Sequence, residues 1–244
     1  MRVVGVIPAR LESTRLPGKP LLPLGGRPII EWVWENAKRA KLIDELVVAT
    51  DSKEIRNRAG GFGAKVFVTS SAPRSGTERV AEVARSFPAD IYLNIQGDEP
   101  FLTGELIDKV VRLLVEGPEA DVATLAVPAT EKEYLDPNVV KLVLDERGFA
   151  LYFSRSPIPY FRRRACAPSK HIGIYAYRKE TLLSLVEEDI SPLAEAESLE
   201  QLDFLFHGKR ILVVLEKNPP FLLGIDTQTD YQRAIDYVSS LQED

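Results

Sequence analysis

Residues 3–10 read VVGVIPAR, an apolar run that ends in a proline and then a charge. A run of this length, rich in β-branched residues and closed by turn-forming ones, is typical of a buried strand. The next apolar side chains recur at the spacing of one helix face: Ile30, Val33, Trp34 and Ala37. This order of strand, loop and helix decides the fold prediction, because it is repeated along the first half of the chain.

Three further apolar runs are predicted as strands, at Glu45–Thr50, Lys65–Thr69 and Asp90–Ile95, with helical patterns between them. Right-handed crossovers then predict a mostly parallel sheet with helices on both faces. From Asp121 the strand-like runs follow one another with little helix between them, which indicates an inserted antiparallel region at about 121–178. We therefore predict one Rossmann-like α/β domain over residues 1–244.

The composition excludes several classes of protein. A net charge of −5 argues against a nucleic-acid binder. One cysteine, Cys166, and two histidines, His171 and His207, can form neither a disulfide framework nor a Cys-based or multi-His metal centre. The apolar runs are far shorter than the roughly 20 residues of a transmembrane helix, and none fits a signal peptide. We expect a cytoplasmic protein without nucleic-acid or membrane partners.

Polar, charged and glycine residues follow every predicted parallel strand. Ligands of open parallel sheets bind at the carboxyl ends of the strands. The segments expected at this edge are Pro8–Lys19, Thr50–Asp51, Ser70–Arg79 and Gln96–Phe101. Their convergence predicts a binding site there.

The loop after the first strand carries three cations, Arg10, Arg15 and Lys19. Neither the P-loop spacing nor a G-x-G-x-x-G motif is present, which disfavours a dinucleotide-binding dehydrogenase. Cations in such a loop suit an oligophosphate, and the alternative is a solvated basic loop. The stretch 75–77, Ser-Gly-Thr, either caps a helix or offers backbone N–H groups to a base or phosphate.

Two aspartates follow apolar runs that lead to the same edge. Asp98 comes directly after the predicted strand Asp90–Ile95, and Asp226 follows the run that begins at Phe221. Mg²⁺ takes one or two carboxylates and completes its shell with water and phosphate oxygens. Asp98 and Asp226 are therefore predicted Mg²⁺ ligands, with a solvated turn or a helix cap as the alternative.

A separate polar set lies in the second half of the chain. His171 and Tyr175 share one face of a predicted strand by the alternation of side chains. Arg155, Glu200 and Gln201 lie on neighbouring segments. These side chains either line a pocket or form structural hydrogen bonds.

Seven segments, spread from Ile7 to Thr227, resemble the signature segments of the CMP-KDO synthetases, the 3-deoxy-manno-octulosonate (KDO) cytidylyltransferases. They read IPARLESTRLPGKPL, SGTER, NIQGDEP, LYFSRSPIP, HIGIYAYR, SLEQL and GIDT. The resemblance implies a nucleotidyltransferase-like fold and attack of the KDO anomeric hydroxyl on the α-phosphate of CTP. The products would be CMP-KDO, used for lipopolysaccharide biosynthesis, and pyrophosphate. The inserted strands resemble the dimerisation element of the family, which implies a homodimer.

The resemblance also implies roles for individual residues. The catalytic residues would be Arg10, Lys19 and Asp98, and the magnesium ligands Asp98 and Asp226. The nucleotide would bind at Ala9, Arg10, Arg15, Lys19, Arg74, Ser75 and Gly76. The position after the predicted strands adds Pro8, Thr50, Asp51, Gln96 and Gly97 to the expected nucleotide site. The sugar acid would bind at Gln96, Arg155, His171, Tyr175, Glu200 and Gln201.

Two positions depart from the family pattern. Family members commonly have a histidine shortly before Ser-Gly-Thr, where this chain has Pro73-Arg74, and often an arginine where it has Asp203. Two other functions compete with the main prediction: the same chemistry on another acidic sugar such as sialic acid, and a nucleotide-binding regulatory module without turnover.

Overall fold

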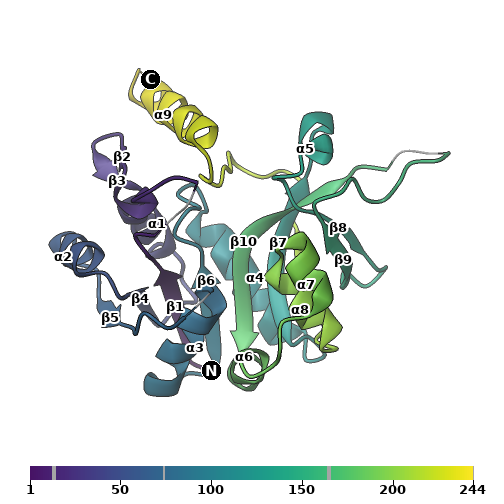
Figure 1. Cartoon of the computed structure of the whole chain (residues 1–244), viewed down its shortest axis with the longest axis horizontal. Coiled ribbons are helices and arrows are strands. Elements are labelled where there is room, and N and C mark those ends of the chain that lie inside the picture. The colour runs from purple at the N-terminus through teal and green to yellow at the C-terminus, as the bar shows by residue number, and fades with distance from the viewer. Residues whose placement is uncertain (13–14, 74, 164–165, 244) are drawn as a thin grey trace. The chain divides into compact units, whose positions relative to one another are not determined.

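The computed structural model describes residues 1–12, 15–73, 75–163 and 166–243 (Figure 1). The chain divides into two compact units. The first contains residues 1–108 and 221–244, and the second contains residues 109–220. Within the described ranges no helix has the length and apolar character needed to cross a membrane. That residues 1–244 form a single domain stays a prediction.

The first unit is built on a parallel sheet with the strand order β6-β1-β4-β5. Its strands are β1 (Val3–Pro8), β4 (Glu45–Thr50), β5 (Val66–Val68) and β6 (Ile91–Ile95). The residues of β1 are buried up to Pro8, because helices cover the sheet on both sides. The parallel sheet predicted from the sequence is confirmed, and the predicted strands agree with the observed ones to within two residues at each end.

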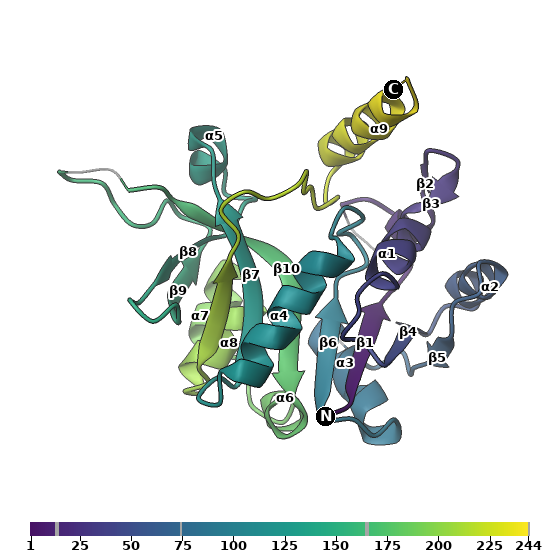
Figure 2. The same cartoon turned by 180° about the vertical axis from the view of Figure 1, so that it is seen from behind.

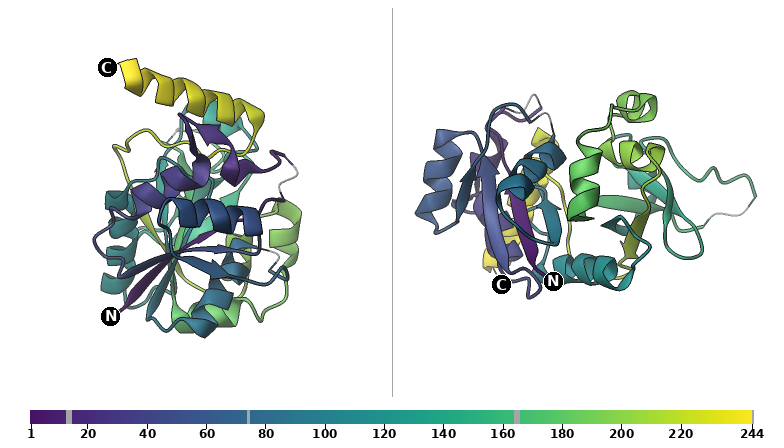
Figure 3. Two further views of the ribbon diagram at one scale, coloured as in Figure 1. Left: turned by 90° about the vertical axis from the view of Figure 1, so that its left-hand side faces the viewer. Right: turned by 90° about the horizontal axis from the view of Figure 1, so that it is seen from below.

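Helices alternate with these parallel strands along the chain, an order whose crossovers are right-handed in nearly all known proteins. They are α1 (Ile29–Ala37), α2 (Lys53–Gly61) and α3 (Gly76–Ser86), and α4 (Gly104–Glu116) begins in this unit. Helix α3 lies in front of the sheet in Figure 1, and α1 lies in front of it in the reverse view of Figure 2. Helix α2 packs against β4 and β5 (Figure 3). The predicted apolar face of α1, Ile30, Val33, Trp34 and Ala37, is buried.

Short elements and a last helix complete the first unit. The 3-10 turn η1 (Lys19–Leu21) precedes a small antiparallel ribbon of β2 (Pro23–Leu24) and β3 (Arg27–Pro28), and α9 (Gln228–Glu243) follows the extended segment 221–227. The buried residues of the parallel sheet form one apolar cluster of this unit. A second apolar cluster joins the loop after β1, β2, α1 and α9; it consists of Leu16, Leu24, Ile29, Phe101, Ile225, Ala234 and Val238. This cluster matters for the site because it holds two segments in place: the loop after β1, through Leu16, and the segment before α9, through Ile225.

The second unit contains the antiparallel strands. Its strands are β7 (Val122–Pro128), β8 (Lys141–Leu144), β9 (Ala150–Ser154), β10 (Ser169–Arg178) and β11 (Ile211–Leu215). Strand β7 pairs with β10 antiparallel and with β11 parallel, while β8 pairs antiparallel with both β10 and β9. The helices are α5 (Glu131–Leu135), α6 (Lys179–Leu185), α7 (Pro192–Glu197) and α8 (Glu200–Phe206). The antiparallel pairing predicted at about 121–178 is confirmed.

Candidate active site

Lys19 lies between two carboxylates that come from distant parts of the sequence. Its Nζ is 2.6 Å from Asp98 Oδ2 and 3.0 Å from Asp226 Oδ1. A second cation, Arg15, places Nη2 3.2 Å from the same Asp226 oxygen. The structure thus brings together the basic loop after β1 and both predicted metal ligands, all within the first unit.

Local backbone features place each member of this cluster. Gly18, with φ +67°, supplies the left-handed residue immediately before Lys19, a conformation that strains any residue with a Cβ. The N–H of Gly18 donates to Leu11 O at 3.2 Å, which closes the basic loop. A Cβ on Gly97 would lie 3.0 Å from Pro8 O, so glycine at this position allows the close approach of the two strand ends without a shift of the backbone.

Asp98 and Asp226 are also linked through the backbone. The Ile225 N–H donates to Asp98 O at 2.9 Å. The Ile225 side chain is fully buried in the second apolar cluster with Phe101, which follows Asp98 by three residues. Beyond Asp226, Thr227 and Asp230 exchange hydrogen bonds at the start of α9. The packing of α9 therefore decides where the Asp226 carboxylate lies.

The charges of this cluster are balanced and partly shielded from water. The Lys19 side chain is 14% exposed, against 24% for Asp98 and 42% for Asp226. Burial alone would lower the pKa of Lys19, but the charges and hydrogen bonds of the two carboxylates outweigh it and raise that pKa. Lys19 is therefore a cation at neutral pH, held by two anions.

The two carboxylates fit a hard divalent cation. Oxygens of both converge on one positive charge, the Lys19 ammonium, so the cluster already binds a cation at this point. In the part of the chain that the structure describes, no group of three or more His, Cys, Asp or Glu side chains could ligate a metal. Two carboxylates suffice for Mg²⁺, which completes its shell with water and phosphate oxygens.

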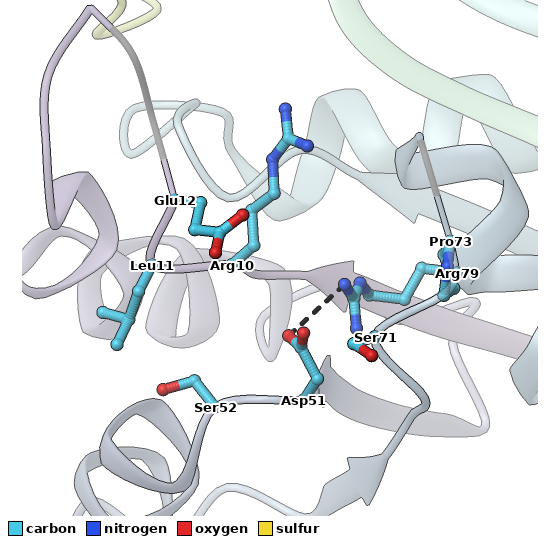
Figure 4. A pocket seen from close by; sticks show the side chains of 8 residues that line it. All are labelled: Arg10, Leu11, Glu12, Asp51, Ser52, Ser71, Pro73 and Arg79. Carbon is cyan, nitrogen blue, oxygen red and sulfur yellow. Dashed lines mark ion pairs between the residues drawn. The ribbon is translucent and has the colours of Figure 1, made fainter.

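A pocket of about 240 Å³ opens in the same unit beside the basic loop (Figure 4). Its lining residues are Arg10, Leu11, Glu12, Asp51, Ser52, Ser71, Pro73 and Arg79. Arg10 and Asp51 were predicted for the nucleotide site, whereas Arg79 was not. The Arg79 Nη2 atom lies 3.3 Å from Asp51 Oδ1, and the Arg79 side chain is only 5% exposed. A buried arginine thus fixes the Asp51 carboxylate at the pocket wall.

Two hydroxyl groups predicted for the nucleotide site make local structural bonds. Ser75 caps α3, because its side chain accepts from the Glu78 N–H at 3.1 Å. Thr50 is buried, and its Oγ1 accepts from the Ser52 N–H at 3.1 Å. Gly76 begins α3 beside β1 and β6, where a Cβ would lie 3.3 Å from Pro8 Cγ. A role of these residues in nucleotide binding stays a prediction.

The other residues predicted for the nucleotide lie at the ends of the parallel strands. Pro8 is the last residue of β1 and Ala9 follows it, with the Ala9 N–H donating to Ala49 O at 2.9 Å. Gln96 and Gly97 follow β6. Arg74 lies outside the described residues, so the departure from the family pattern at that position has no structural account.

The second unit brings together three residues of the set predicted for the sugar acid. The rings of His171 and Tyr175 lie 5.2 Å apart, which confirms that they share a face of β10. The Tyr175 hydroxyl donates to Gln201 Oε1 at 3.2 Å. Burial first, and then the Glu200 and Tyr177 side chains, raise the pKa of Tyr175 well above its ordinary value. Tyr175 is therefore a neutral hydrogen-bonding group.

The hydrogen bonds around Thr124 fix the protonation of His171. The Thr124 hydroxyl donates to Ile174 O at 2.6 Å, within a bulge of β10. Its 2.8 Å contact with His171 Nε2 therefore requires the imidazole to be the donor. Burial lowers the pKa of His171 to about 3. The ring is thus neutral near pH 7, with the proton on Nε2 and Nδ1 left as an acceptor.

Arg155 is engaged in structural contacts. Its Nε donates to Glu197 O at 2.7 Å and its Nη1 to Pro137 O at 3.1 Å. Its backbone N–H donates to the Glu197 carboxylate at 2.7 Å. The predicted contact of Arg155 with the sugar acid stays a prediction, as does that of Glu200, at the start of α8.

The structure explains the departure at Asp203. Asp203 Oδ1 accepts from the Ser191 N–H at 2.6 Å, and Ser191 is the N-cap of α7. The carboxylate thus ties α8 to the start of α7. An arginine could not accept this bond, so the residue here has a structural role in this chain.

Comparison with known proteins places this fold and site in a class. A model of the cytidylyltransferase family matches residues 4–211, which include Lys19 and Asp98 as well as most of the second unit. The matched range therefore covers the parallel sheet together with two of the three residues of the cluster Lys19, Asp98 and Asp226.

Individual relatives narrow the class. The 3-deoxy-manno-octulosonate cytidylyltransferase of Bdellovibrio bacteriovorus is 44% identical over 98% of this chain and 99% of its own. The enzyme of the same name from Chlamydia pneumoniae is 42% identical over 98% and 94%. The structure of a CMP:2-keto-3-deoxy-manno-octonic acid synthetase complexed with CTP has a TM-score of 0.92 and 38% identity, over 99% of this chain and all of that one. The chain belongs to the family of the 3-deoxy-manno-octulosonate cytidylyltransferases.

Proposed function

We propose that the protein transfers CMP from CTP to 3-deoxy-manno-octulosonate, giving CMP-KDO and pyrophosphate. The observation that carries this proposal is the cluster of Lys19, Asp98 and Asp226 at the carboxyl edge of the parallel sheet. The family relationship supports the choice of both substrates. Sialic acid as the sugar is not favoured, because the relatives compared above carry the KDO name.

The basic loop has the charges that phosphoryl chemistry requires. Attack at the α-phosphate builds up negative charge on the leaving pyrophosphate, so the reaction depends on positioning and electrostatic stabilisation. Arg10, Arg15 and Lys19 would hold the triphosphate and neutralise that charge. Mg²⁺ bound by Asp98 and Asp226 would polarise the phosphate oxygens and lower the pKa of a bound hydroxyl.

The residues of the second unit suit a polyhydroxy acid. The neutral Nδ1 of His171 would accept a hydrogen bond from a hydroxyl group of the sugar. Tyr175, whose ring lies next to that of His171, forms a fixed polar pair with Gln201. A hydrogen-bonding site of this kind discriminates strongly against ligands that leave its polar groups unpaired. His171, Tyr175 and Gln201 would therefore select the sugar acid.

The same proposal includes a homodimer in the cytoplasm that serves lipopolysaccharide biosynthesis. Among the described residues of the second unit, the large apolar side chains with the highest exposure are Leu135 at 62%, Leu151 at 61% and Tyr160 at 85%. They offer apolar surface that a second copy of the chain could cover.

Pyrophosphate release from CTP tests this function. We expect release with KDO and Mg²⁺, at least about 100-fold slower release with N-acetylneuraminate, and none after the metal is chelated. Equal rates with the two sugars would contradict the assignment of KDO. Tight CTP binding without turnover on either sugar would favour the regulatory module.

A further inference from the structure

The Lys19 ammonium lies where the two predicted metal ligands converge. It is 2.6 Å from Asp98 Oδ2 and 3.0 Å from Asp226 Oδ1, so both carboxylates are already bound to a cation without any metal. Mg²⁺ binds carboxylate oxygens at about 2.0–2.1 Å. A metal that binds both oxygens would therefore need the space that Nζ takes.

The charges of the cluster also disfavour binding of a metal while Lys19 is in this position. Asp98 and Asp226 contribute two negative charges, and Lys19 and Arg15 contribute two positive ones. A divalent cation that approaches this neutral cluster gains little attraction and is repelled by an ammonium within contact distance. The Lys19 side chain is only 14% exposed, so water screens this repulsion weakly.

Lys19 also has a second group to bind when the nucleotide is present. In the function proposed above, on which this inference rests, Lys19 binds the triphosphate. If its ammonium moves to the phosphates, both carboxylates lose their cation at the moment when phosphate oxygens arrive to complete a metal shell.

We propose that Lys19 is an internal competitor of the metal. In the nucleotide-free protein its ammonium neutralises Asp98 and Asp226 and keeps the metal affinity low. Binding of the triphosphate removes it from the carboxylates, so that metal and nucleotide bind with positive coupling. The coupling is reciprocal: a metal that binds first would displace Lys19 toward the phosphate site and favour the nucleotide.

Binding of Mn²⁺ to the nucleotide-free protein tests this proposal without any measurement of activity. Free Mn²⁺ is measured by its electron paramagnetic resonance signal during titration of the wild type and of Lys19→Met. We expect the dissociation constant of Lys19→Met to be at least about tenfold lower than that of the wild type, because a contacting charge is lost. Lys19→Gln serves as a second variant if Lys19→Met does not fold.

Arg15→Met is the matched control, since it removes the same charge from the same cluster. Arg15 is 53% exposed, and of the two carboxylates it contacts only that of Asp226. We therefore expect Arg15→Met to change the Mn²⁺ affinity by less than about threefold. An effect of Arg15→Met equal to that of Lys19→Met would show that net charge, and not occupation of the site, controls metal affinity. It would contradict the proposal.

The substitution Asp98→Asn, made alone and together with Lys19→Met, tests the competition by Lys19 and the assignment of the metal ligands separately. If Lys19→Met binds Mn²⁺ no more tightly than the wild type, yet Asp98→Asn abolishes binding, the competition by Lys19 is refuted and the metal site stands. If Asp98→Asn leaves Mn²⁺ binding unchanged in the Lys19→Met background, Asp98 is not a metal ligand and the competition by Lys19 is refuted with it. The proposed transfer of CMP to KDO is tested separately, by pyrophosphate release.

Discussion

Asp98→Asn is expected to lower kcat for CMP transfer by about 10³-fold or more while the fold is retained. Loss of a partner that only supports a metal ligand typically costs 10–100-fold, and loss of a charged ligand should cost more. The substitution also removes the charged oxygen that lies 2.6 Å from Lys19 Nζ. Of the two carboxylates, only that of Asp226 then remains beside the ammonium. The measurement is steady-state pyrophosphate release, with circular dichroism as the check on folding.

Asp236→Asn provides the control for this substitution. Asp236 lies on α9, is exposed, and accepts a hydrogen bond from the Gln232 side chain at 2.9 Å. The change removes the same charge from the same unit without touching the Lys19 cluster, so kcat should stay within about twofold. Activity near that of the wild type in Asp98→Asn would refute the metal site.

Lys141→Met is expected to lower the free energy of unfolding by about 3 kcal/mol. Lys141 is completely buried in β8, and its ammonium donates to three backbone carbonyls, those of Asp136, Val139 and Arg155. Burial lowers the pKa of Lys141, and the three carbonyls compensate for part of that cost. Methionine fills similar space but leaves the three acceptors without their donor.

Urea unfolding measures this loss, with Lys132→Met as the control. Lys132 is an exposed residue of α5 in the same unit, where the same substitution should change stability by less than about 0.5 kcal/mol. A loss below 1 kcal/mol in Lys141→Met would show that the carbonyls find other donors and that Lys141 does not hold β8, β9 and the loop before them together.

The sequence predicted the fold best where the hydrophobic periodicity matched that of a known architecture, the parallel α/β sheet. Apolar runs and helical spacing in the first half led to the parallel sheet, and the carboxyl-edge rule led to Lys19 and Asp98. Both predictions follow from general rules: apolar faces of strands and helices are buried against one another, and ligands bind at the carboxyl ends of parallel strands. The interpretation of Asp226 as a residue at a strand end was wrong, because the segment 221–227 before α9 forms no strand, although Asp226 does lie beside Lys19. The seven family segments gave both substrates, which no single motif would have done.

The contacts that depend on side-chain packing could not be read from the sequence. Lys19 and Asp226 are separated by 207 positions, and their contact depends on how α9 packs on Leu16 and Phe101. The ion pair between Arg79 and Asp51 also depends on tertiary packing, since no pattern in the run Ser75–Arg79 indicates that Arg79 is buried and paired. Hydrophobic patterns determine which faces are buried but not which polar atoms meet.

The second unit shows the same limit. Alternation predicted that His171 and Tyr175 share a face, and their rings do lie together. The protonation of His171 depends on Thr124, whose hydroxyl is positioned by a bulge in β10 that the alternating pattern does not reveal. Bulges shift the register locally and are set by tertiary packing.

Transfer of the α-phosphate is the most direct test of the central claim. The protein is incubated with CTP labelled at the α-phosphate, KDO and Mg²⁺, and the labelled products are separated and identified by mass. We predict that the label enters a product that contains both CMP and KDO, in a 1:1 ratio with released pyrophosphate. Release of orthophosphate, or label confined to CDP or CTP in the presence of KDO, would contradict the account.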